Sequence, residues 1–299
     1  MRKSVLIVGS GNIAKKHRKS LKLISKKIKV KNITSRNFQA FLKANKNKLK
    51  FNFIIVCSPS SEHHRHISLI ENSFEKIKVL VEKPLFNKFI EIKKKLKNYY
   101  FIGYNLRFHP IIIFLKKFLS RKKIFSINVI CTSYLPHWRK GKDYRKSVSA
   151  QKKFGGGVTL ELSHEIDYLD WILKNFKILN SYNKKISNLK INVDDVLNLT
   201  AEKNKKTFLN LNINFFSVSK RRAILIDGKD FSIDADLVKN EIKIYEKEKV
   251  KTISYKKFKM IDSYKNQNNS LIKGKFKNLC NIQQGLKVLK IISKIKNKK

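Results

Sequence analysis

The stretch Val5-Leu6-Ile7-Val8-Gly9-Ser10-Gly11-Asn12-Ile13-Ala14 decides the fold of the N-terminal part of this 299-residue chain. Its apolar start is typical of a buried strand in a parallel sheet. The pattern G-x-G-x-x-A follows: Gly9 permits a tight turn, Gly11 lets a pyrophosphate approach the backbone, and Ala14 lets a helix pack closely on the sheet. Pyrophosphate oxygens accept hydrogen bonds from the N–H groups of a helix N-terminus. The stretch therefore predicts a dinucleotide-binding turn, provided that it lies within a βαβ series.

Apolar or β-branched runs alternate with helical patterns through the first hundred residues. The predicted strands span 4–8, 28–34, 53–57, 78–82 and 99–104, and the predicted helices span 13–25, 37–46, 62–72 and 88–96. Continuous apolar runs are expected of parallel strands that are buried on both faces. The series predicts an α/β fold with a doubly wound parallel sheet of the Rossmann type, in which ligands bind at the carboxyl ends of the strands.

The pattern changes after residue 106, which separates an expected dinucleotide-binding domain (1–106) from an expected substrate-binding and oligomerisation domain (107–299). Helices are predicted at 110–119, 157–174 and 276–296, and strands at 124–134, 177–187, 194–202, 206–217, 222–227, 230–235, 241–247 and 250–255. Few helical signals separate these strands, so we expect an α+β domain with a large, open, mostly antiparallel sheet. An uncovered apolar sheet face needs a partner, which predicts a homodimer or homotetramer formed through the open sheet.

The charge of the chain is strongly positive. Lys and Arg number 68 against 21 Asp and Glu, a formal net charge of +47, and only ten of the basic residues are Arg. A protein that reads DNA sequence normally favours Arg for guanine. We therefore expect a solvated lysine surface and no nucleic-acid partner, although such a charge favours anionic ligands.

Cysteine usage and hydropathy bear on the cellular compartment. Cys57, Cys131 and Cys280 are scattered and form neither a disulfide framework nor a C-x-x-C metal site, as expected of a reduced, cytoplasmic protein. No apolar run reaches the ~18–20 residues that a membrane span needs. The N-terminus leads directly into a strand and lacks the features of a signal peptide.

The end of the second predicted strand bears on the choice of cofactor. It reads Thr34-Ser35-Arg36-Asn37, without the acidic residue that usually binds the ribose diol of NAD. Ser35 and Arg36 suit the 2′-phosphate of NADP, so the sequence favours NADP over NAD. The alternative is that Arg36 stacks on the adenine or faces solvent.

Val81-Glu82-Lys83-Pro84 ends the fourth predicted strand. A cis bond before proline costs little, and such a turn can direct Lys83 into the cleft. Beside a cationic nicotinamide in a partly dry pocket, the pKa of an ammonium falls, which suits it to proton transfer. The alternative is an ordinary turn, which the abundance of lysine would favour if the other motifs were absent.

Two groups of histidines invite a functional interpretation. After Gly155-Gly156-Gly157, a predicted helix places Glu161, His164, Tyr168 and Trp171 on one stripe, where His164 can relay a hydroxyl proton. The alternative is a core histidine bonded to backbone. His63, His64 and His66 follow Ser58-Pro59, but no nearby cysteine or carboxylate pair completes a zinc site. For this group we expect a packing role at a helix start beside the cofactor, and no metal.

Five ordered motifs resemble those of the glucose–fructose oxidoreductase, inositol dehydrogenase and rhizopine catabolism (Gfo/Idh/MocA) family of NAD(P)-dependent oxidoreductases. They are Gly9–Ala14 with His17, Ser58-Pro59 with His63, Glu82-Lys83-Pro84, Gly103-Tyr104-Asn105-Leu106-Arg107-Phe108-His109-Pro110, and Gly155-Gly156-Gly157 with His164 and Asp167. The resemblance implies a Rossmann domain, an open-sheet domain, a lysine–histidine proton relay, and sugar or cyclitol substrates. The family usually has Asp four residues before the histidine, whereas Glu161 is three before it, which leaves the role of Glu161 open.

The motifs and the resemblance together define the expected site. The catalytic residues are expected to be Lys83 and His164. The expected cofactor-binding residues are Gly9, Gly11, Asn12, Ile13, Ser35, Arg36, Ser58, Pro59, His63, Glu82 and Lys83. The expected substrate-binding residues are Tyr104, Arg107, Trp138, Arg139, Tyr144, Glu161 and Asp167.

The expected activity is hydride transfer between a nicotinamide and a secondary alcohol of a sugar, nucleotide-linked sugar or cyclitol, bound between the cofactor and the sheet domain. Segments 138–145 and 163–167 also resemble a branch of the family associated with surface-polysaccharide sugars. Two alternatives stay open. One is a basic Rossmann module that senses NADP or docks on nucleic acid without turnover. The other is a reductase of the same fold that acts on a non-sugar substrate, such as a tetrapyrrole or an imine.

Overall fold

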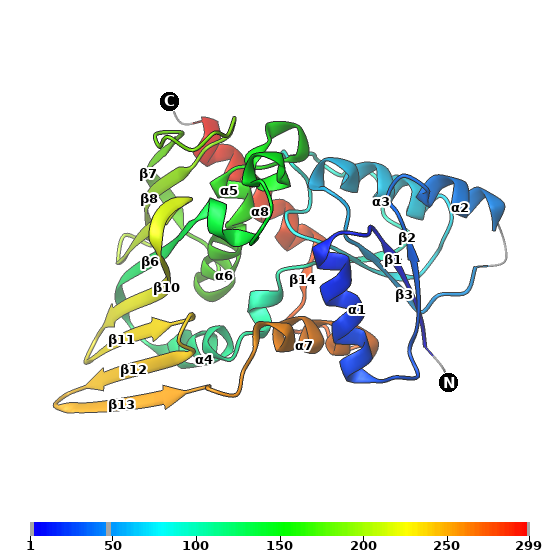
Figure 1. Cartoon of the computed structure of the whole chain (residues 1–299). Helices are drawn as coiled ribbons and strands as arrows, with labels where there is room; N and C mark the ends of the chain where they lie inside the picture. The colour runs from blue at the N-terminus through cyan, green and yellow to red at the C-terminus, as the bar shows by residue number, and fades with distance from the viewer. Residues whose placement is uncertain (1–2, 46–48, 298–299) are drawn as a thin grey trace. The chain divides into compact units, whose positions relative to one another are not determined.

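The computed structural model describes residues 3–45 and 49–297. The chain divides into two compact units, which are coloured by residue number in Figure 1. The first comprises Met1–Phe108 and Lys259–Leu289, and the second comprises His109–Phe258 and Lys290–Lys299. The first unit therefore includes a segment from late in the chain, and helix α8 (Ile282–Asn297) begins in one unit and ends in the other.

A six-stranded sheet forms the centre of the first unit (Figure 1). Its strands, in the order β14-β5-β4-β3-β1-β2, are Cys280–Asn281, Tyr99–Ile102, Lys78–Val81, Phe53–Val56, Ser4–Val8 and Lys29–Ile33. All neighbours are parallel except β14, which pairs antiparallel with β5. Strands β1, β3 and β4 are almost wholly buried, while β2 lies at an edge and stays partly exposed, contrary to the expectation of burial on both faces. The predicted doubly wound sheet is confirmed.

Three of the four helices predicted for this region are present. They are α1 (Asn12–Ile24), α2 (Phe38–Ala44) and α3 (His63–Glu71). The helix predicted at 88–96 is wrong, because that segment is described without helix. Three consecutive lysines at 93–95 repel one another, and Phe89 is exposed, so no apolar stripe holds a helix against the sheet.

Helix α7 (Met260–Ile272) was not predicted from the sequence, although it packs beside α1 in the first unit. Its buried positions are Ser263, Tyr264, Gln267, Asn268 and Leu271. Because most of these side chains are polar, the helix lacks the apolar period by which amphipathic helices are recognised. Polar partners in the first unit hold it instead.

The second unit is built on an eight-stranded sheet in the order β13-β12-β11-β10-β6-β9-β8-β7. In that order the strands span Lys249–Ser254, Glu241–Glu246, Phe231–Asp236, Phe216–Gly228, Ile124–Tyr134, Thr207–Asn214, Val196–Lys203 and Lys177–Lys184. Only the pair β6–β9 is parallel. The mostly antiparallel sheet predicted for this region is confirmed.

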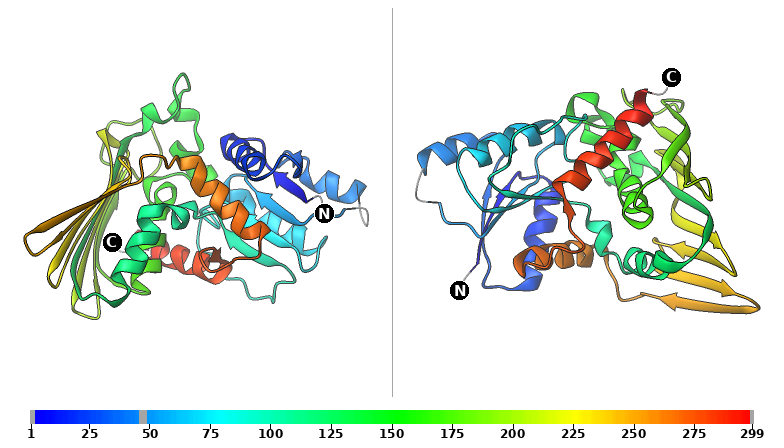
Figure 2. Two further views of the ribbon diagram at one scale, coloured as in Figure 1. Left: turned by 90° about the horizontal axis from the view of Figure 1, so that it is seen from below. Right: turned by 180° about the vertical axis from the view of Figure 1, so that it is seen from behind.

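Helices cover one face of this sheet, as the views in Figure 2 show. They include α4 (Pro110–Phe118) and α6 (Ser163–Leu173). Alternate residues such as Ile127, Val129 and Leu211 are buried on the covered face. The single helix predicted at 157–174 is two, because Leu162 leaves helical geometry (φ −97°, ψ 27°) between α5 (Val158–Glu161) and α6.

Candidate functional site

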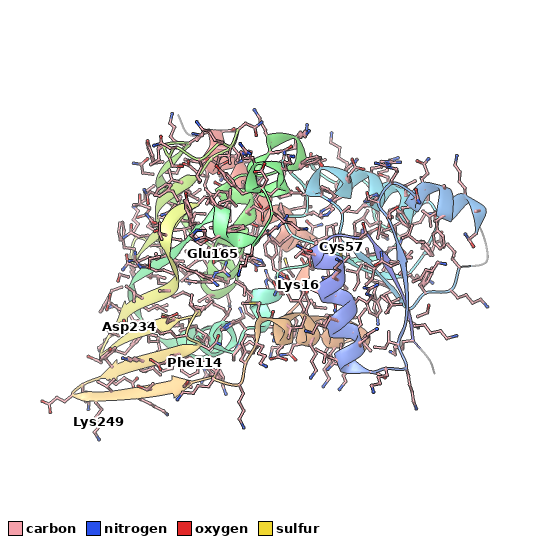
Figure 3. All side chains as sticks on the ribbon, in the orientation of Figure 1. Lys16, Cys57, Phe114, Glu165, Asp234 and Lys249 are labelled. Carbon is pink, nitrogen blue, oxygen red and sulfur yellow. The ribbon has the colours of Figure 1, made fainter. Side chains whose placement is uncertain are left out.

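The glycine turn joins the carboxyl ends of three neighbouring strands. Gly9 has φ +118°, and a Cβ built there would lie 2.7 Å from the carbonyl oxygen of Cys57 at the end of β3 (Figure 3). The Gly9 N–H donates to the Ile33 carbonyl at 2.7 Å, and the Asn32 amide donates to the Gly9 carbonyl at 2.7 Å. Both the positive φ and the close approach require glycine at this position.

Helix α1 presents an open N-terminus beyond this turn. Gly11 is its N-cap residue, no side chain caps it, and its first turn holds no acidic residue. A Cβ built on Gly11 would meet nothing within 4 Å, and the following Asn12 is exposed. The backbone N–H groups of Asn12, Ile13 and their neighbours thus offer hydrogen bonds and a positive dipole end to an anion. This arrangement fits the pyrophosphate of a dinucleotide.

His66 links the ends of β2 and β3. Its Nδ1 lies 2.8 Å from the Ser58 hydroxyl and its Nε2 lies 3.2 Å from the Ser35 hydroxyl. Burial, with a contribution from His63, lowers the pKa of His66 to about 4, so the ring is neutral at pH 7. A neutral ring accepts from one serine and donates to the other. The shorter Ser58 contact fits a donating hydroxyl, which leaves the Ser35 hydroxyl hydrogen directed elsewhere. Arg36 next to it is exposed.

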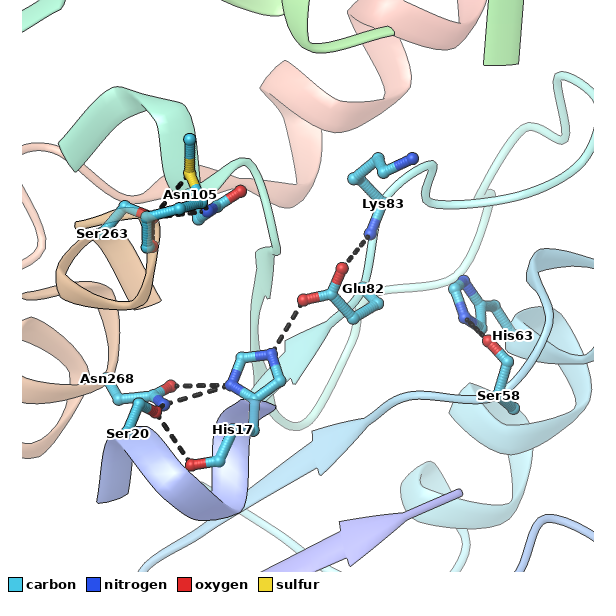
Figure 4. A network of polar contacts seen from close by, with 10 residues as sticks. His17, Ser20, Ser58, His63, Glu82, Lys83, Asn105, Ser263 and Asn268 are labelled. Carbon is cyan, nitrogen blue, oxygen red and sulfur yellow. Dashed lines mark hydrogen bonds and ion pairs between the residues drawn. The ribbon is translucent and has the colours of Figure 1, made fainter. Parts of the chain in front are cut away.

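Glu82 is a buried carboxylate whose two oxygens are both engaged (Figure 4). Its Oε1 lies 2.8 Å from His17 Nε2, and its Oε2 accepts from the backbone N–H of Lys83 at 3.3 Å. A Cβ on Gly103 would lie 2.7 Å from Glu82 Oε1, so the glycine makes room for the carboxylate. Glu82 therefore anchors the turn that carries Lys83, and the Lys83–Pro84 peptide is cis, as expected from the sequence.

The anchor of Glu82 continues into α7. His17 Nδ1 contacts the side-chain amide of Asn268, which donates to the Ser20 hydroxyl at 2.6 Å (Figure 4). Sequence reasoning missed Asn268 because it did not predict α7. From the sequence, His17 was named only as part of a motif. The signal that could have identified it as a site residue was its position one helical turn after Ile13.

His63 contacts three backbone carbonyl groups. Its Nδ1 lies 3.1 Å from the Pro84 oxygen and 3.0 Å from the Leu85 oxygen, and its Nε2 lies 2.9 Å from the Ser58 oxygen. The side chain is completely buried, and burial lowers its pKa although the carbonyls act in the opposite sense. Pro59 separates Ser58 from the short helical turn that leads into α3. His63 thus links the end of β3 to the turn after Lys83.

Two expected substrate-binding residues of the first unit are core residues. Tyr104 and Arg107 are among its largest fully buried side chains. Arg107 donates to the Gln284 side chain at 2.8 Å, and the neighbouring Asn105 donates to the Ser263 hydroxyl at 2.6 Å. Both contacts join the segment after β5 to helices late in the chain, so the structure shows a packing role for Arg107.

Three other expected substrate-binding residues lie together in the second unit. They line a hollow of about 460 Å³. Its lining comprises Leu135, Trp138, Arg139, Lys142, Asp143, Tyr144, Lys146, Ser147 and Ser149. The Trp138 indole donates to the Ser133 hydroxyl at 2.8 Å, and the Tyr144 hydroxyl accepts from the Lys190 backbone N–H at 3.0 Å. Both aromatic rings are thereby fixed at the wall of the hollow.

Electrostatics make this hollow positive. Arg139, Lys142 and Lys146 contribute cations, while the carboxylate of Asp143 accepts two bonds from its neighbour Arg145 at 2.9 Å. These bonds with Arg145 lower the pKa of Asp143 below its ordinary value. The remaining field favours an anionic group next to the two aromatic rings.

The remaining expected residues lie around the break between α5 and α6. Glu161 ends α5, whereas His164 and Asp167 belong to α6, so the single stripe expected for Glu161 and His164 is not continuous. His164 is half-buried and Asp167 is buried. As far as the described residues show, none of the three lines the 460 Å³ hollow.

Other described features limit the chemistry. Cys57, Cys131 and Cys280 are free thiols, and burial raises the pKa of Cys57 and of Cys131. Within residues 3–45 and 49–297, no three His, Cys, Asp or Glu side chains are grouped to hold a metal ion. No helix among them is long and apolar enough to cross a membrane.

Comparison of the sequence with protein families confirms the resemblance. Residues 3–99 match the Gfo/Idh/MocA model, described as an oxidoreductase family with an NAD-binding Rossmann fold. The match covers the parallel strands β1 to β4, the glycine turn and the Lys83 turn. A search of curated proteins finds no match.

Solved structures share the fold of the whole chain at low sequence identity. The WlbA dehydrogenase from Bordetella pertussis, in complex with NADH and UDP-GlcNAcA, is 15% identical with a TM-score of 0.76, covering 99% of this chain and 96% of its own. A levoglucosan dehydrogenase in complex with NADH is 13% identical with a TM-score of 0.81 and the same coverage. An inositol dehydrogenase homolog complexed with NAD⁺ from Azotobacter vinelandii is 10% identical, with a TM-score of 0.77 and coverage of 98% and 94%.

Proposed function

We propose, from the match of residues 3–99 to an NAD-binding oxidoreductase family, that the protein transfers hydride between a nicotinamide dinucleotide and a secondary alcohol of a sugar-type substrate. The observation that carries the proposal is the pairing of two features at the carboxyl end of one sheet. One is the open, uncapped N-terminus of α1, and the other is Lys83 on a turn anchored by Glu82. The first binds a dinucleotide, and the second supplies an ammonium group.

The residues at the glycine turn fit a dinucleotide. Gly11 leaves open space where a side chain would stand, and α1 offers N–H groups to the pyrophosphate. Ser35 and Arg36, after β2, are positioned for the adenosine ribose. A donating Ser35 hydroxyl and the Arg36 guanidinium favour a phosphate at the 2′ position, so we assign NADP as the preferred cofactor.

We assign to Lys83 the transfer of the substrate hydroxyl proton. A bound nicotinamide accepts or releases hydride, and the chain must manage the proton that accompanies it. An ammonium held near the reacting oxygen polarises a carbonyl and exchanges a proton with the alkoxide. His164, in the second unit, is the second residue that we assign to this proton. Glu82 and His63, expected to bind the cofactor, act in this assignment through their contacts with the Lys83 turn.

The hollow in the second unit supports a sugar carrying an anionic group. Trp138 and Tyr144 offer aromatic faces to a sugar ring, and Arg139, Lys142 and Lys146 suit a carboxylate or phosphate. A nucleotide-linked sugar or a uronic acid meets both requirements. Trp138→Ala and Arg139→Ala are therefore expected to raise the KM for substrate without changing the affinity for NADPH.

Self-association through the uncovered sheet face is also part of the proposal. On β6, β9 and β8, the residues that face away from the helices are Ser126, Asn128, Ile130, Phe208, Asn210, Asn212, Asn198, Thr200 and Glu202. None is Lys or Arg, in a chain with 68 basic residues. Two copies that meet through this part of the face therefore place no Lys or Arg of these strands against one another.

Titration and a substrate screen test the proposed function. Fluorescence titration with NADPH and NADH is expected to show saturable binding that is tighter for NADPH, and a screen of sugars and sugar nucleotides is expected to show NADPH formation or consumption. Titration with DNA at rising salt is the control. Steeply salt-dependent DNA binding without any change in cofactor fluorescence would assign the chain to a nucleic-acid-binding module instead.

A further inference from the structure

We propose that His63 is a positioning residue that fixes the Lys83 ammonium by clamping the turn after it to the end of β3. This inference rests on the proposed function, because it concerns the lysine that handles the proton. It differs from the sequence-based expectation that His63 binds the cofactor. The carrying observation is the set of carbonyl groups around the ring, two from Pro84 and Leu85 and one from Ser58.

His63 lies between the turn after Lys83 and the segment after β3. The Pro84 and Leu85 carbonyls lie one and two residues beyond Lys83 in the chain, while Ser58 follows β3. His63 lies between these two segments with contacts of 2.9–3.1 Å. A neutral ring carries one N–H, so it donates to the carbonyls of one segment and packs against the carbonyl of the other. The imidazole is completely buried, so water does not compete for these carbonyls. Removing the ring would leave the two segments without this connection.

Lys83 is also held on the side of the preceding residue, Glu82. There the Lys83 backbone N–H donates to Glu82, which is itself held by His17 (Figure 4). Both chain neighbours of Lys83 therefore contact a histidine. Glu82 is held by His17, and Pro84 is held by His63. The two histidines come from α1 and α3, the helices that follow the strands β1 and β3. A lysine with both chain neighbours fixed has fewer positions for its ammonium, as proton transfer at a defined atom requires.

The positioning role of His63 is distinct from cofactor binding. Among the described contacts, the ring nitrogens of His63 meet only backbone carbonyls of the protein. The neighbour His66 is the histidine that contacts the serine hydroxyls after β2 and β3. His63 and His66 therefore divide two tasks on one helix, which gives them different predicted effects when they are replaced.

The experiment compares His63→Leu, His63→Gln and the control Arg65→Gln, in which an exposed neighbour on the same helix is changed. Glutamine keeps an N–H donor for the carbonyls, and leucine does not. We expect kcat to fall about 10- to 100-fold in His63→Leu, as for a misplaced reacting group. We expect a smaller fall in His63→Gln, an unchanged Kd for NADPH in both, and wild-type behaviour in Arg65→Gln.

Two further readouts distinguish positioning from a general loss of structure. In a Lys83→Gln background, His63→Gln is expected to cause no further loss of single-turnover hydride transfer, because the group that it positions is already absent. Trace acetylation read by mass spectrometry reports the reactivity of the Lys83 amine relative to the exposed Lys88. That ratio is expected to change in His63→Gln and to stay at the wild-type value in Arg65→Gln.

The outcomes that overturn the inference are distinct. Wild-type Lys83 labelling in His63→Gln, or an equal loss of hydride transfer with and without Lys83, removes the positioning role. A loss of NADPH affinity that accounts for the whole loss of turnover returns His63 to the cofactor site. If the wild-type protein binds no dinucleotide, the proposed function fails, while the Lys83 labelling ratio still decides whether His63 holds the turn.

Discussion

At the scale of single residues, the glycines of the site differ in what a side chain at each position would meet. Gly9 and Gly103 are constrained by neighbouring protein atoms, the Cys57 carbonyl and the Glu82 carboxylate respectively. Gly11 has open space around it. Structural constraint therefore explains the first two glycines, whereas the space at Gly11 is available to a ligand.

Gly103→Ala and Gly11→Ala form a matched pair that tests this distinction. Gly103→Ala is expected to lower the free energy of unfolding by about 1–3 kcal/mol, because the new methyl group displaces a buried, paired carboxylate. Gly11→Ala is expected to leave unfolding nearly unchanged and to weaken NADPH binding. Urea unfolding and fluorescence titration measure the two effects. Equal destabilisation by both changes would contradict the distinction.

Three buried histidines, His63, His66 and His109, make stability depend on pH, because burial lowers the pKa of each. Burial lowers the pKa of His66 and of His109 to about 4, from an ordinary value near 6.5. Between pH 6.5 and pH 4 the unfolded chain therefore holds more protons, and the free energy of unfolding falls as pH falls, by up to about 1.4 kcal/mol per pH unit for each histidine. Urea unfolding at pH 7 and pH 5 measures this loss.

His109→Gln should reduce the slope of unfolding free energy with pH, since one of these buried rings is gone. A wild-type protein whose unfolding free energy is the same at pH 7 and pH 5 would show that these rings are not kept neutral.

At the scale of elements, the sequence was informative where burial is apolar and uninformative where it is polar. Most strands of both sheets and the helices α1, α3 and α4 were predicted close to their observed bounds, because their apolar periods are regular. The exceptions are β14, which lies where a helix was predicted at 276–296, and β10, which begins at Phe216 and not at the predicted residue 222. Helix α7 was missed because its inner face is polar. The segment 88–96 was misread because its apolar residues are not buried, Phe89 being exposed, and its lysines are adjacent.

The same reason limits what the sequence revealed of the candidate site. The glycine turn and the Lys83 turn follow apolar strands and were recognised as motifs. The partners that hold them, such as Asn268 on α7, are far apart in the chain and polar, so no local pattern reports them. The motif that names Tyr104 and Arg107 says nothing of burial, and the structure adds that both are buried. Their expected contact with substrate stays a prediction.

The docking of α7 through Asn268 predicts a measurable stability effect. Asn268→Ala removes the buried partner of His17 and Ser20 and is expected to lower the free energy of unfolding by about 1–3 kcal/mol. The exposed Asn266 on the same helix is the control, and Asn266→Ala should change it by less than about 0.5 kcal/mol. Similar effects of the two changes would show that the polar face of α7 does not fix it.

At the scale of the whole molecule, the distribution of charge is uneven. Lysines are abundant along the chain, yet the uncovered face of β6, β9 and β8 carries asparagines that bond across strands, such as Asn128 with Asn210 and Asn198 with Asn212. On β10 and β11, Asp227 and Asp234 add negative charge to this face, while Arg221 on β10 and Lys243 on β12 add positive charge. The part of the face on β6, β9 and β8, which carries no basic side chain, is suited to contact a second copy.

Leu225→Lys tests this contact. Leu225 is exposed on β10, on the same face as Asp227. Light scattering after size exclusion is expected to give a dimer or tetramer for the wild-type protein and a smaller species for Leu225→Lys, because the new charge is repelled by its copy. Leu23→Lys, at an exposed position on α1, is the control and should not change the mass. A wild-type monomer at micromolar concentration would contradict the proposed association.

The central claim is that a dinucleotide lies on the α1 N-terminus while Lys83 manages the proton of the reaction. The most direct measurement compares NADPH affinity and hydride transfer in the wild-type protein and in Lys83→Gln. In Lys83→Gln the Kd for NADPH is expected to stay nearly the same, while turnover is expected to fall by about 10²–10⁴-fold. Full turnover in Lys83→Gln, or a loss of NADPH affinity that accounts for the loss of turnover, would contradict it.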